Sequence, residues 1–304
     1  MTQAAEPPVQ AGEPVIQSGI VRRSSPMRRL LKNPTGLGGL IFLGIVALVA
    51  ILAPILATHD PNVADITHVL AGPGGDNLLG TDGNGRDIWS RIVFGARLTL
   101  LAAAVAAITA IVVGLPSGLI AGYFGGAFDG VSSWATNVLM SLPAIIVLLA
   151  VRAAIGPSVW WTMVVFGFLL SPGYFRLTRT AVQSVRNELY VDAARVSGLS
   201  DSRIISRHIL GVVRAPIIIQ TAMVSGMAIS VSASLEFLGL GDPTVATWGA
   251  MVSDGFKNIY RAPLGLLWPI IAISGTIGAF VLVGNALRDA LEDLEKHKVK
   301  RAKP

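Results

Sequence analysis

The sequence has no cysteine, only four histidines and few charged residues, and each shortage excludes a class of protein. Without cysteine there is no disulfide scaffold, zinc–thiolate site, iron–sulfur cluster or cysteine nucleophile. Charged residues make up 14% of the 304 residues, against about 25% in soluble proteins, whereas apolar residues make up 52%. The histidines are scattered, with no pair at the spacing of metal ligands: His59, His68, His208 and His297. This composition favours an integral membrane protein.

Motifs of nucleotide binding and hydrolysis are also missing. No lysine follows a glycine, so the phosphate-cradling loop G-x-x-x-x-G-K-[ST] cannot be built. The hydrolase motifs G-x-S-x-G and H-E-x-x-H do not occur either. We therefore expect no catalytic residues, no metal site and no cofactor bound by this chain.

Six stretches contain no Asp, Glu, Lys or Arg, and the shortest is 21 residues long. About 20 helical residues cross the ~30 Å hydrocarbon core of a bilayer, so each stretch is long enough for one crossing. They cover residues 33–59, 98–128, 130–151, 153–175, 215–235 and 262–287. We therefore predict an all-α integral membrane protein with six transmembrane helices.

Lys and Arg are divided unevenly between alternate loops. With the N-terminus in the cytoplasm, 18 of them fall on the cytoplasmic side and 6 on the opposite side. Cytoplasmic loops carry an excess of Lys and Arg, so we expect both termini in the cytoplasm. The chain then divides into a disordered cytoplasmic tail (1–30), helix 1 (31–57), an extracytoplasmic loop (58–95), a five-helix core (96–291) with a cytoplasmic loop at about 176–212, and a basic cytoplasmic tail (292–304).

Two prolines and one arginine interrupt the apolar stretches. Pro116 and Pro143 lie inside helical windows and predict kinks. Arg152 is the only charge between the third and fourth windows, and Gly156-Pro157 indicates a turn close behind it. We expect Arg152 in a short interfacial loop, with its side chain reaching the headgroups. The alternative is a buried functional arginine.

Small residues recur in two of the windows. Gly114, Gly118 and Gly122 lie four residues apart, which lets helix backbones approach closely, and we expect packing within this chain. The window at 215–235 is small and polar over much of its surface, which suits either helix packing or an aqueous path. Candidate residues of a translocation path there are Met223, Met227, Ser230 and Ser234. No window contains Asp or Glu, which makes an ion-coupled secondary transporter the less favoured alternative, together with a channel.

The predicted cytoplasmic loop contains three short helical segments. The first ends at about Asn187, the second runs from about Leu189 to Ser197, and the third begins after a cap at Ser200 or Asp201. Gly198 ends the second segment, where a positive φ is favoured.

This loop carries a motif. Asp192-Ala193-Ala194, then Gly198, then Ile209-Leu210-Gly211 resembles the EAA loop of permease subunits of bacterial ABC importers. That motif has E-A-A, three residues, G, and later I-x-L-P, so Asp here replaces Glu and Gly211 replaces Pro.

Three further segments resemble the C-type permeases of dipeptide and oligopeptide importers. The first is the run LGTDGNGRDIWSRIVFGAR at 79–97. The second is LEFLGLG at 235–241, followed by WGAM at 248–251. The third is NALRDAL at 285–291, and all occur in the family's order between about residues 25 and 294.

The resemblance implies the type I ABC importer permease fold and one pore subunit in the cytoplasmic membrane of a bacterium. It implies a heterodimer with a second permease, one or two cytoplasmic ABC ATPase subunits that bind ATP and Mg, and an extracytoplasmic solute-binding protein. No nucleic acid is expected. Short peptides are the implied cargo, whereas relatives import nickel chelates, haem, glutathione or opines, and no residue here chooses among these.

The resemblance also assigns candidate site residues. Those implied to couple to the ATPase are Tyr190, Asp192, Ala193, Ala194, Arg195 and Gly198. Asp192 is expected to cap the helix or to pair with a basic group on the partner, and the alanines permit close contact. Anchoring to lipid headgroups is the alternative for the arginines. Candidates for binding-protein docking or gating are Asp82, Arg86, Asp87 and Trp248, with a solvated loop as the alternative.

Overall fold

The computed structural model describes residues 30–301 except 32 and 243, with side chains described to residue 291. The predicted tail at 1–30 therefore lies almost wholly outside the described residues. Within them, the regular structure is helical apart from isolated β-bridges at Gly74–Asn77 and Thr81–Asp87.

The longer helices are α2 (Pro34–Ile51), α4 (Ile88–Phe124), α5 (Gly126–Ser141), α6 (Ala144–Ile155), α7 (Val159–Val185), α10 (Leu210–Leu235) and α12 (Leu264–Arg301). The shorter ones are α3 (Ala53–Leu56), α8 (Leu189–Val196), α9 (Asp201–Ile204), η1 (Ile205–Ile209), η2 (Glu236–Leu240) and α11 (Trp248–Lys257).

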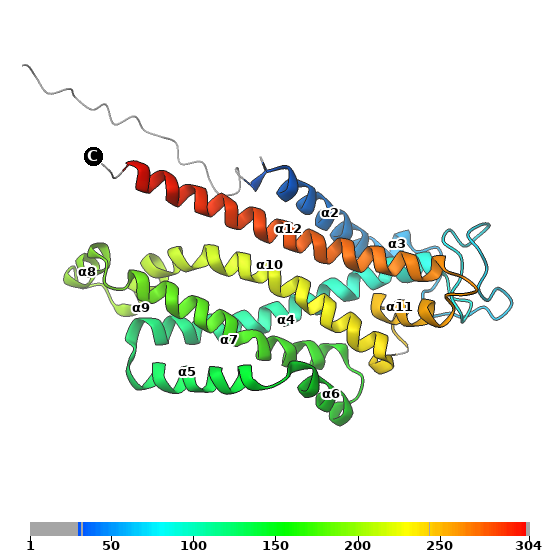
Figure 1. The fold of residues 1–304 in the computed structure, drawn as a ribbon, viewed down its shortest axis with the longest axis horizontal. Coiled ribbons are helices and arrows are strands. Elements are labelled where there is room, and N and C mark those ends of the chain that lie inside the picture. Colours follow the sequence, from blue (N-terminus) through cyan, green and yellow to red (C-terminus); the bar gives the residue numbers. More distant parts are fainter. Residues whose placement is uncertain (1–29, 32, 243, 302–304) are drawn as a thin grey trace, which may run out of the picture.

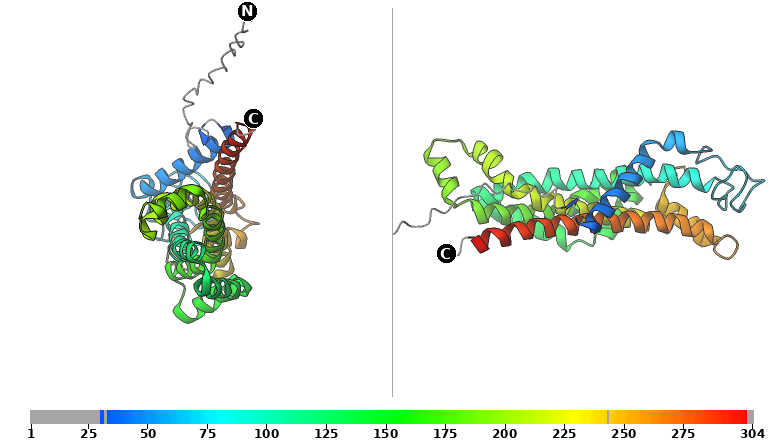
Figure 2. Two further views of the ribbon diagram at one scale, coloured as in Figure 1. Left: turned by 90° about the vertical axis from the view of Figure 1, so that its left-hand side faces the viewer. Right: turned by 90° about the horizontal axis from the view of Figure 1, so that it is seen from above.

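These helices form an elongated bundle with two different ends (Figure 1). One end, named here the α8 end, carries α8 and α9, and α12 finishes on the same side. The opposite end, the α11 end, carries α11 and the loop at 57–87. The view from above shows the same separation of the two ends (Figure 2).

Four helical segments are long and apolar enough to cross a membrane: 34–51, 88–124, 201–240 and 264–291. Helices α5 and α6 make a fifth such unit only when they are taken together, because they are bent by 81° where they meet. Helix α7 is not among them, since polar and basic residues fill its second half. The structure therefore supports a multi-pass helical membrane protein, and the count of six crossings stays a prediction.

The bend between α5 and α6 lies at the predicted proline. Helix α5 ends at Ser141, and Pro143 is the N-cap of α6, so the third window is two helices and not one straight crossing. Pro lacks an N–H and clashes with the preceding turn, which breaks a helix at this point. Helix α4 by contrast continues through Pro116.

The glycine row of α4 packs within the chain, as predicted, and its partner is α7. A Cβ on Gly118 would lie 2.6 Å from the carbonyl oxygen of Phe175, and one on Gly122 would lie 2.7 Å from Cβ of Val182. Both distances are closer than a side chain allows, so glycine lets the two backbones touch. We call this contact, which also includes Gly114, the glycine seam.

Candidate functional sites

The predicted short helices between α7 and α10 are confirmed. Helix α8 runs from Leu189 to Val196, and α9 begins at Asp201 with Ser200 as its N-cap. Gly198 has φ +76°, the left-handed conformation expected of a helix-ending glycine. Its N–H donates to the carbonyl of Arg195 at 2.9 Å, which closes the helix. The chain therefore leaves α8 at an abrupt turn.

Helix α8 has one face toward the bundle and one toward solvent. Val191 and Ala194 are buried in an apolar cluster with Val182 of α7 and Ile204 of α9. Ala194 thus packs within the chain, which differs from the close contact with a partner expected from the resemblance. The other candidate coupling residues are exposed: Tyr190, Asp192, Ala193, Arg195 and Gly198.

Charged groups on or beside α8 act on two of these exposed side chains. Asp192 does not cap the helix, because its Oδ1 accepts from Nη1 of Arg195 at 3.0 Å. Partial burial and the carboxylate of Glu188 raise the pKa of Tyr190, so its hydroxyl stays protonated and can donate a hydrogen bond. At the helix ends, Leu189 and Val196 leave 86% and 89% of their surfaces exposed, which gives α8 an uncovered apolar surface.

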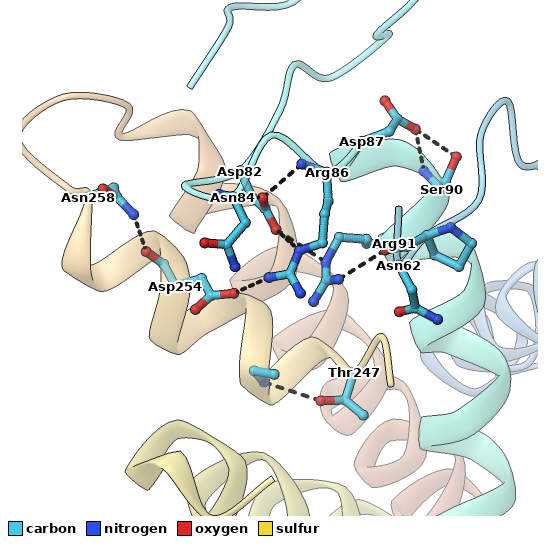
Figure 3. A network of polar contacts seen from close by, with 12 residues as sticks. Asn62, Asp82, Asn84, Arg86, Asp87, Ser90, Arg91, Thr247, Asp254 and Asn258 are labelled. Atoms are coloured by element: carbon cyan, nitrogen blue, oxygen red, sulfur yellow. Dashed lines mark hydrogen bonds and ion pairs between the residues drawn. The ribbon is translucent and has the colours of Figure 1, made fainter. Parts of the chain in front are cut away.

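At the α11 end, two buried arginines and two half-buried aspartates form the network of Figure 3. Oδ2 of Asp82 lies 2.8 Å from Nε of Arg86 and 3.5 Å from Nε of Arg91. Nη2 of Arg86 donates to Oδ2 of Asp254 at 2.7 Å, and Nη1 of Arg91 donates to the carbonyl of Pro61 at 3.0 Å. This ion network joins the loop at 57–87, the first turn of α4 and α11.

The other two candidates for docking or gating are structural here. Asp87 caps α4, because its Oδ2 accepts from the N–H of Ser90 at 2.8 Å and from its hydroxyl at 2.7 Å. Helix α4 therefore begins at Ile88, earlier than the boundary expected near residue 96. Trp248 is 2% exposed, and its Nε1 donates to the carbonyl of Ile92 at 2.9 Å. A side chain so buried presents no docking surface.

Three of the four candidate path residues share one exposed face of α10. Met227, Ser230 and Ser234 are exposed, and the two serines line a groove of about 480 Å³. Other residues of the groove are Ala233, Phe237, Leu238, Val252, Ile270, Ile273 and Ser274. Met223 instead packs against α12, since its Cε lies 2.9 Å from where a Cβ on Gly284 would stand. Met223 lies on the same face one turn before Met227, so the four residues line up along α10, but α12 covers the first of them.

Comparison with known families decides what the chain is. Residues 114–296, more than half of the chain, match the binding-protein-dependent transport system inner membrane component. The chain belongs to this family of ABC importer permeases. Residues 25–73 of the permease match the N-terminal TM domain of oligopeptide transport permease C.

Individual relatives of the permease point the same way. It is 40% identical to the dipeptide transport system permease protein DppC of Escherichia coli K12 over 268 residues, covering 86% of this chain and 89% of the relative. It is 37% identical to the protein of that name from Alkalihalophilus pseudofirmus, over 87% and 88% of the two chains. A peptide transport system permease protein of Brucella abortus is 34% identical over 96% and 98% of the two chains.

The structure corrects the interpretation of Arg152 in this permease. Arg152 lies in the last turn of α6 and is 5% exposed, so it is neither in a loop nor at the surface. Its Nε donates to Oγ1 of Thr162 at 3.1 Å, whereas Nη1 and Nη2 are buried without a hydrogen-bond partner among the described residues. The predicted turn follows at Gly156, which has φ +96°. The position of Arg152 therefore agrees with the alternative interpretation, in which this arginine is buried.

Sequence reasoning missed several polar residues of the permease. Glu236 is 5% exposed and accepts hydrogen bonds from Ser232 and from the backbone of Gly249. Asp254 and Arg91 complete the ion network, and no local pattern in the sequence points to them. Among the described side chains, no group of three His, Asp or Glu could hold a metal ion.

Proposed function

We propose that this permease is one of two pore subunits of an ATP-driven importer of short peptides in the cytoplasmic membrane of a bacterium. The family supports a transport role, and relatives that cover most of the chain are named as dipeptide or peptide permeases. ATP and Mg bind to separate ATPase subunits, which matches a chain that has no phosphate-binding loop.

Helix α8 is proposed to be the contact with the ATPase subunits. The observation that carries this is an exposed short helix at one end of the bundle, with Leu189 and Val196 uncovered at its two ends (Figure 1). Exposed apolar side chains beside polar ones are typical of protein interfaces. In this arrangement the α8 end faces the cytoplasm, and Tyr190, Asp192 and Ala193 meet the partner.

The other surfaces are assigned to the remaining partners. The apolar groove beside Ser230 and Ser234 faces the second permease subunit and the path between the two subunits. The loop at 57–87 and α11 face the extracytoplasmic solute-binding protein. The ion network beneath that loop keeps the surface in one shape, because its contacts tie the loop to α4 and to α11.

The test is purification of the tagged permease in mild detergent, followed by mass spectrometry and an ATPase assay. We expect a second permease and ATPase subunits to co-purify, and the reconstituted complex to take up a labelled dipeptide in an ATP-dependent manner. Gly198→Pro and Asp192→Arg should abolish uptake while membrane insertion continues. Recovery of the permease without ATPase subunits would contradict the proposed function.

A matched control separates coupling from folding. Gly156, which ends α6, also has a positive φ, +96°, donates its N–H to the carbonyl of Arg152, and a Cβ there would meet nothing within 4 Å. Gly156→Pro therefore applies the same kind of backbone change away from α8. If Gly156→Pro abolished uptake as completely as Gly198→Pro, the loss would not be specific to α8, and the coupling assignment would fail.

A further inference from the structure

The α8 end of α4 carries a polar cluster beyond the residues discussed so far. The hydroxyl of Tyr123, in the last turn of α4, donates to Oδ1 of Asp201 at 2.6 Å, in the first turn of α9. The guanidinium carbon of Arg195 lies 5.4 Å from the centre of the Tyr123 ring, within the range of a cation–π contact. One side chain of α4 therefore meets both α8 and α9.

Arg195 connects this cluster to α7 as well. Its Nη2 donates to the carbonyl of Arg186, the C-cap of α7, at 3.3 Å. Nη1 of Arg186 in turn donates to the carbonyl of Gly122 at 3.2 Å, one residue before Tyr123. The ends of α4 and α7 are thus tied to each other and to α8 by directional contacts.

The apolar contact of α8 is small by comparison. Only Val191 and Ala194 are buried among its eight residues. Small apolar side chains fix no direction, because hydrophobic contact is non-directional. A hydrogen bond to an ionised carboxylate holds a donor in one geometry and is about twice as strong as a neutral one.

Above the cluster, α4 and α7 are joined along the glycine seam. Helix α4 has 37 residues, which at 1.5 Å per residue is about 55 Å. Its other end lies in the ion network, where Asp87 caps it and Arg91 is 1% exposed. A displacement of α8 that is passed to Tyr123 therefore reaches the α11 end through one continuous helix.

We propose that Tyr123 and Asp201 are positioning residues that form a latch, through which movement of α8 is delivered to the α4–α7 pair. Asp201 fixes the start of α9, Arg195 holds α8 over the Tyr123 ring, and Tyr123 joins both to α4. The latch rests on the proposed function, since the ATPase subunits supply the movement. The latch residues Tyr123 and Asp201 take part in coupling although they do not contact the ATPase subunits.

Tyr123→Phe tests the latch, because it removes the hydroxyl and keeps the ring under Arg195. The complete complex, with ATPase subunits and binding protein, is reconstituted in liposomes, and uptake of radiolabelled alanylalanine is measured together with phosphate release. We expect uptake per ATP hydrolysed to fall about tenfold, the effect of losing one hydrogen bond to a charged group. Basal ATPase activity and the amount of co-purified ATPase should not change.

Tyr260→Phe is the matched control. Tyr260 is fully exposed at 101%, lies in the segment between α11 and α12, and loses the same single hydroxyl. It should leave the ratio of uptake to hydrolysis at the wild-type value. Asp201→Ala, which removes the acceptor, should lower the ratio like Tyr123→Phe, and the double variant should be no worse than either single one, because both remove the same interaction.

A cross-link provides the rescue. Since the chain has no cysteine, Tyr123→Cys and Asp201→Cys place two unique thiols, which a short bifunctional thiol reagent can join. Cross-linking should raise the ratio of the double variant, whereas the same reagent on either single variant should not. A merely structural role of Tyr123 predicts less complex in the membrane but an unchanged ratio.

The outcomes separate the two proposals. If wild-type liposomes show no ATP-driven uptake, the proposed function fails. If the wild type transports and Tyr123→Phe keeps the wild-type ratio, the latch is overturned and the proposed function stands. Additive losses in the double variant would also overturn the latch, because they would mean that the two side chains act separately.

Discussion

The two ends of α4 are held by different kinds of contact. At the α11 end, Asp87 caps the helix, and Arg91 is 1% exposed within the ion network. At the α8 end, Tyr123 is buried in an apolar cluster, and its two polar partners are exposed side chains on short helices. One end is held by buried charges, and the other by apolar packing together with polar contacts to exposed residues.

Because of this difference, the contacts at the two ends of α4 respond differently to a force. Removing one partner from a buried ion pair leaves an uncompensated charge, which costs about 3–5 kcal/mol, so such a network keeps one arrangement. Exposed ion pairs contribute about 0–1 kcal/mol and can break and re-form. A helix held firmly at one end and adjustably at the other is suited to transmit movement from the adjustable end.

The largest effect should come from breaking the ion network. Asp82→Ala leaves Arg86 and Arg91 side by side with Asp254 as their nearest counter-charge. We expect a loss of about 3–5 kcal/mol in stability, because a buried positive charge loses its partner. The measurement is the midpoint of thermal unfolding in detergent, with intrinsic tryptophan fluorescence as the signal.

Asp76→Ala is the control for this prediction. Asp76 is an exposed aspartate in the same loop, so the variant removes the same charge from the same segment. Its unfolding midpoint should match that of the wild type. Equal midpoints for Asp82→Ala and Asp76→Ala would show that the network does not hold the α11 end, and the contrast between the two ends would disappear.

An intermediate effect is expected between the two ends, in the glycine seam. Gly118→Ala places a Cβ 2.6 Å from the carbonyl oxygen of Phe175, which forces α4 and α7 apart. Overpacking of this kind costs about 1–3 kcal/mol. We expect a lower unfolding midpoint and reduced uptake per ATP, because the seam joins α7 to α4, the helix that carries Tyr123 of the latch.

Gly44→Ala gives the comparison for the seam. Gly44 lies within α2, and a Cβ there would meet nothing within 4 Å. The same substitution should be neutral or slightly stabilising, since alanine favours a helix over glycine by about 1 kcal/mol. A midpoint for Gly118→Ala that equalled that of Gly44→Ala would mean that α4 and α7 are not in tight contact.

The sequence predicted those features that depend on neighbouring residues. The ends of α8, the turn at Gly198 and a distortion at Pro143 follow from capping, positive φ and the missing N–H of proline, all of which act within a few residues. The predicted kink at Pro143 is in fact a full break between two helices. The glycine seam was also predictable, because its four-residue spacing is local even though its partner helix is not.

The contacts that sequence reasoning missed join residues far apart in the chain. Arg86 and Asp254 are separated by 168 positions, and Tyr123 and Asp201 by 78. Such pairs depend on how complete helices pack, which no local pattern contains. Arg152 was placed wrongly although its partner is only ten positions away, because its burial depends on how α6 packs on the following helix, which carries Thr162.

The smallest effect on stability is expected at the α8 end, from Arg195→Lys. Lysine keeps the positive charge but loses the planar group that covers the Tyr123 ring and reaches both Asp192 and the carbonyl of Arg186. Because Arg195 is exposed, the unfolding midpoint should stay at the wild-type value. Uptake per ATP should nevertheless fall, by less than in Tyr123→Phe, because the hydrogen bond to Asp201 remains. A drop in the midpoint as large as that of Asp82→Ala would show that both ends of α4 are held equally firmly, and the adjustable end would have to be sought elsewhere.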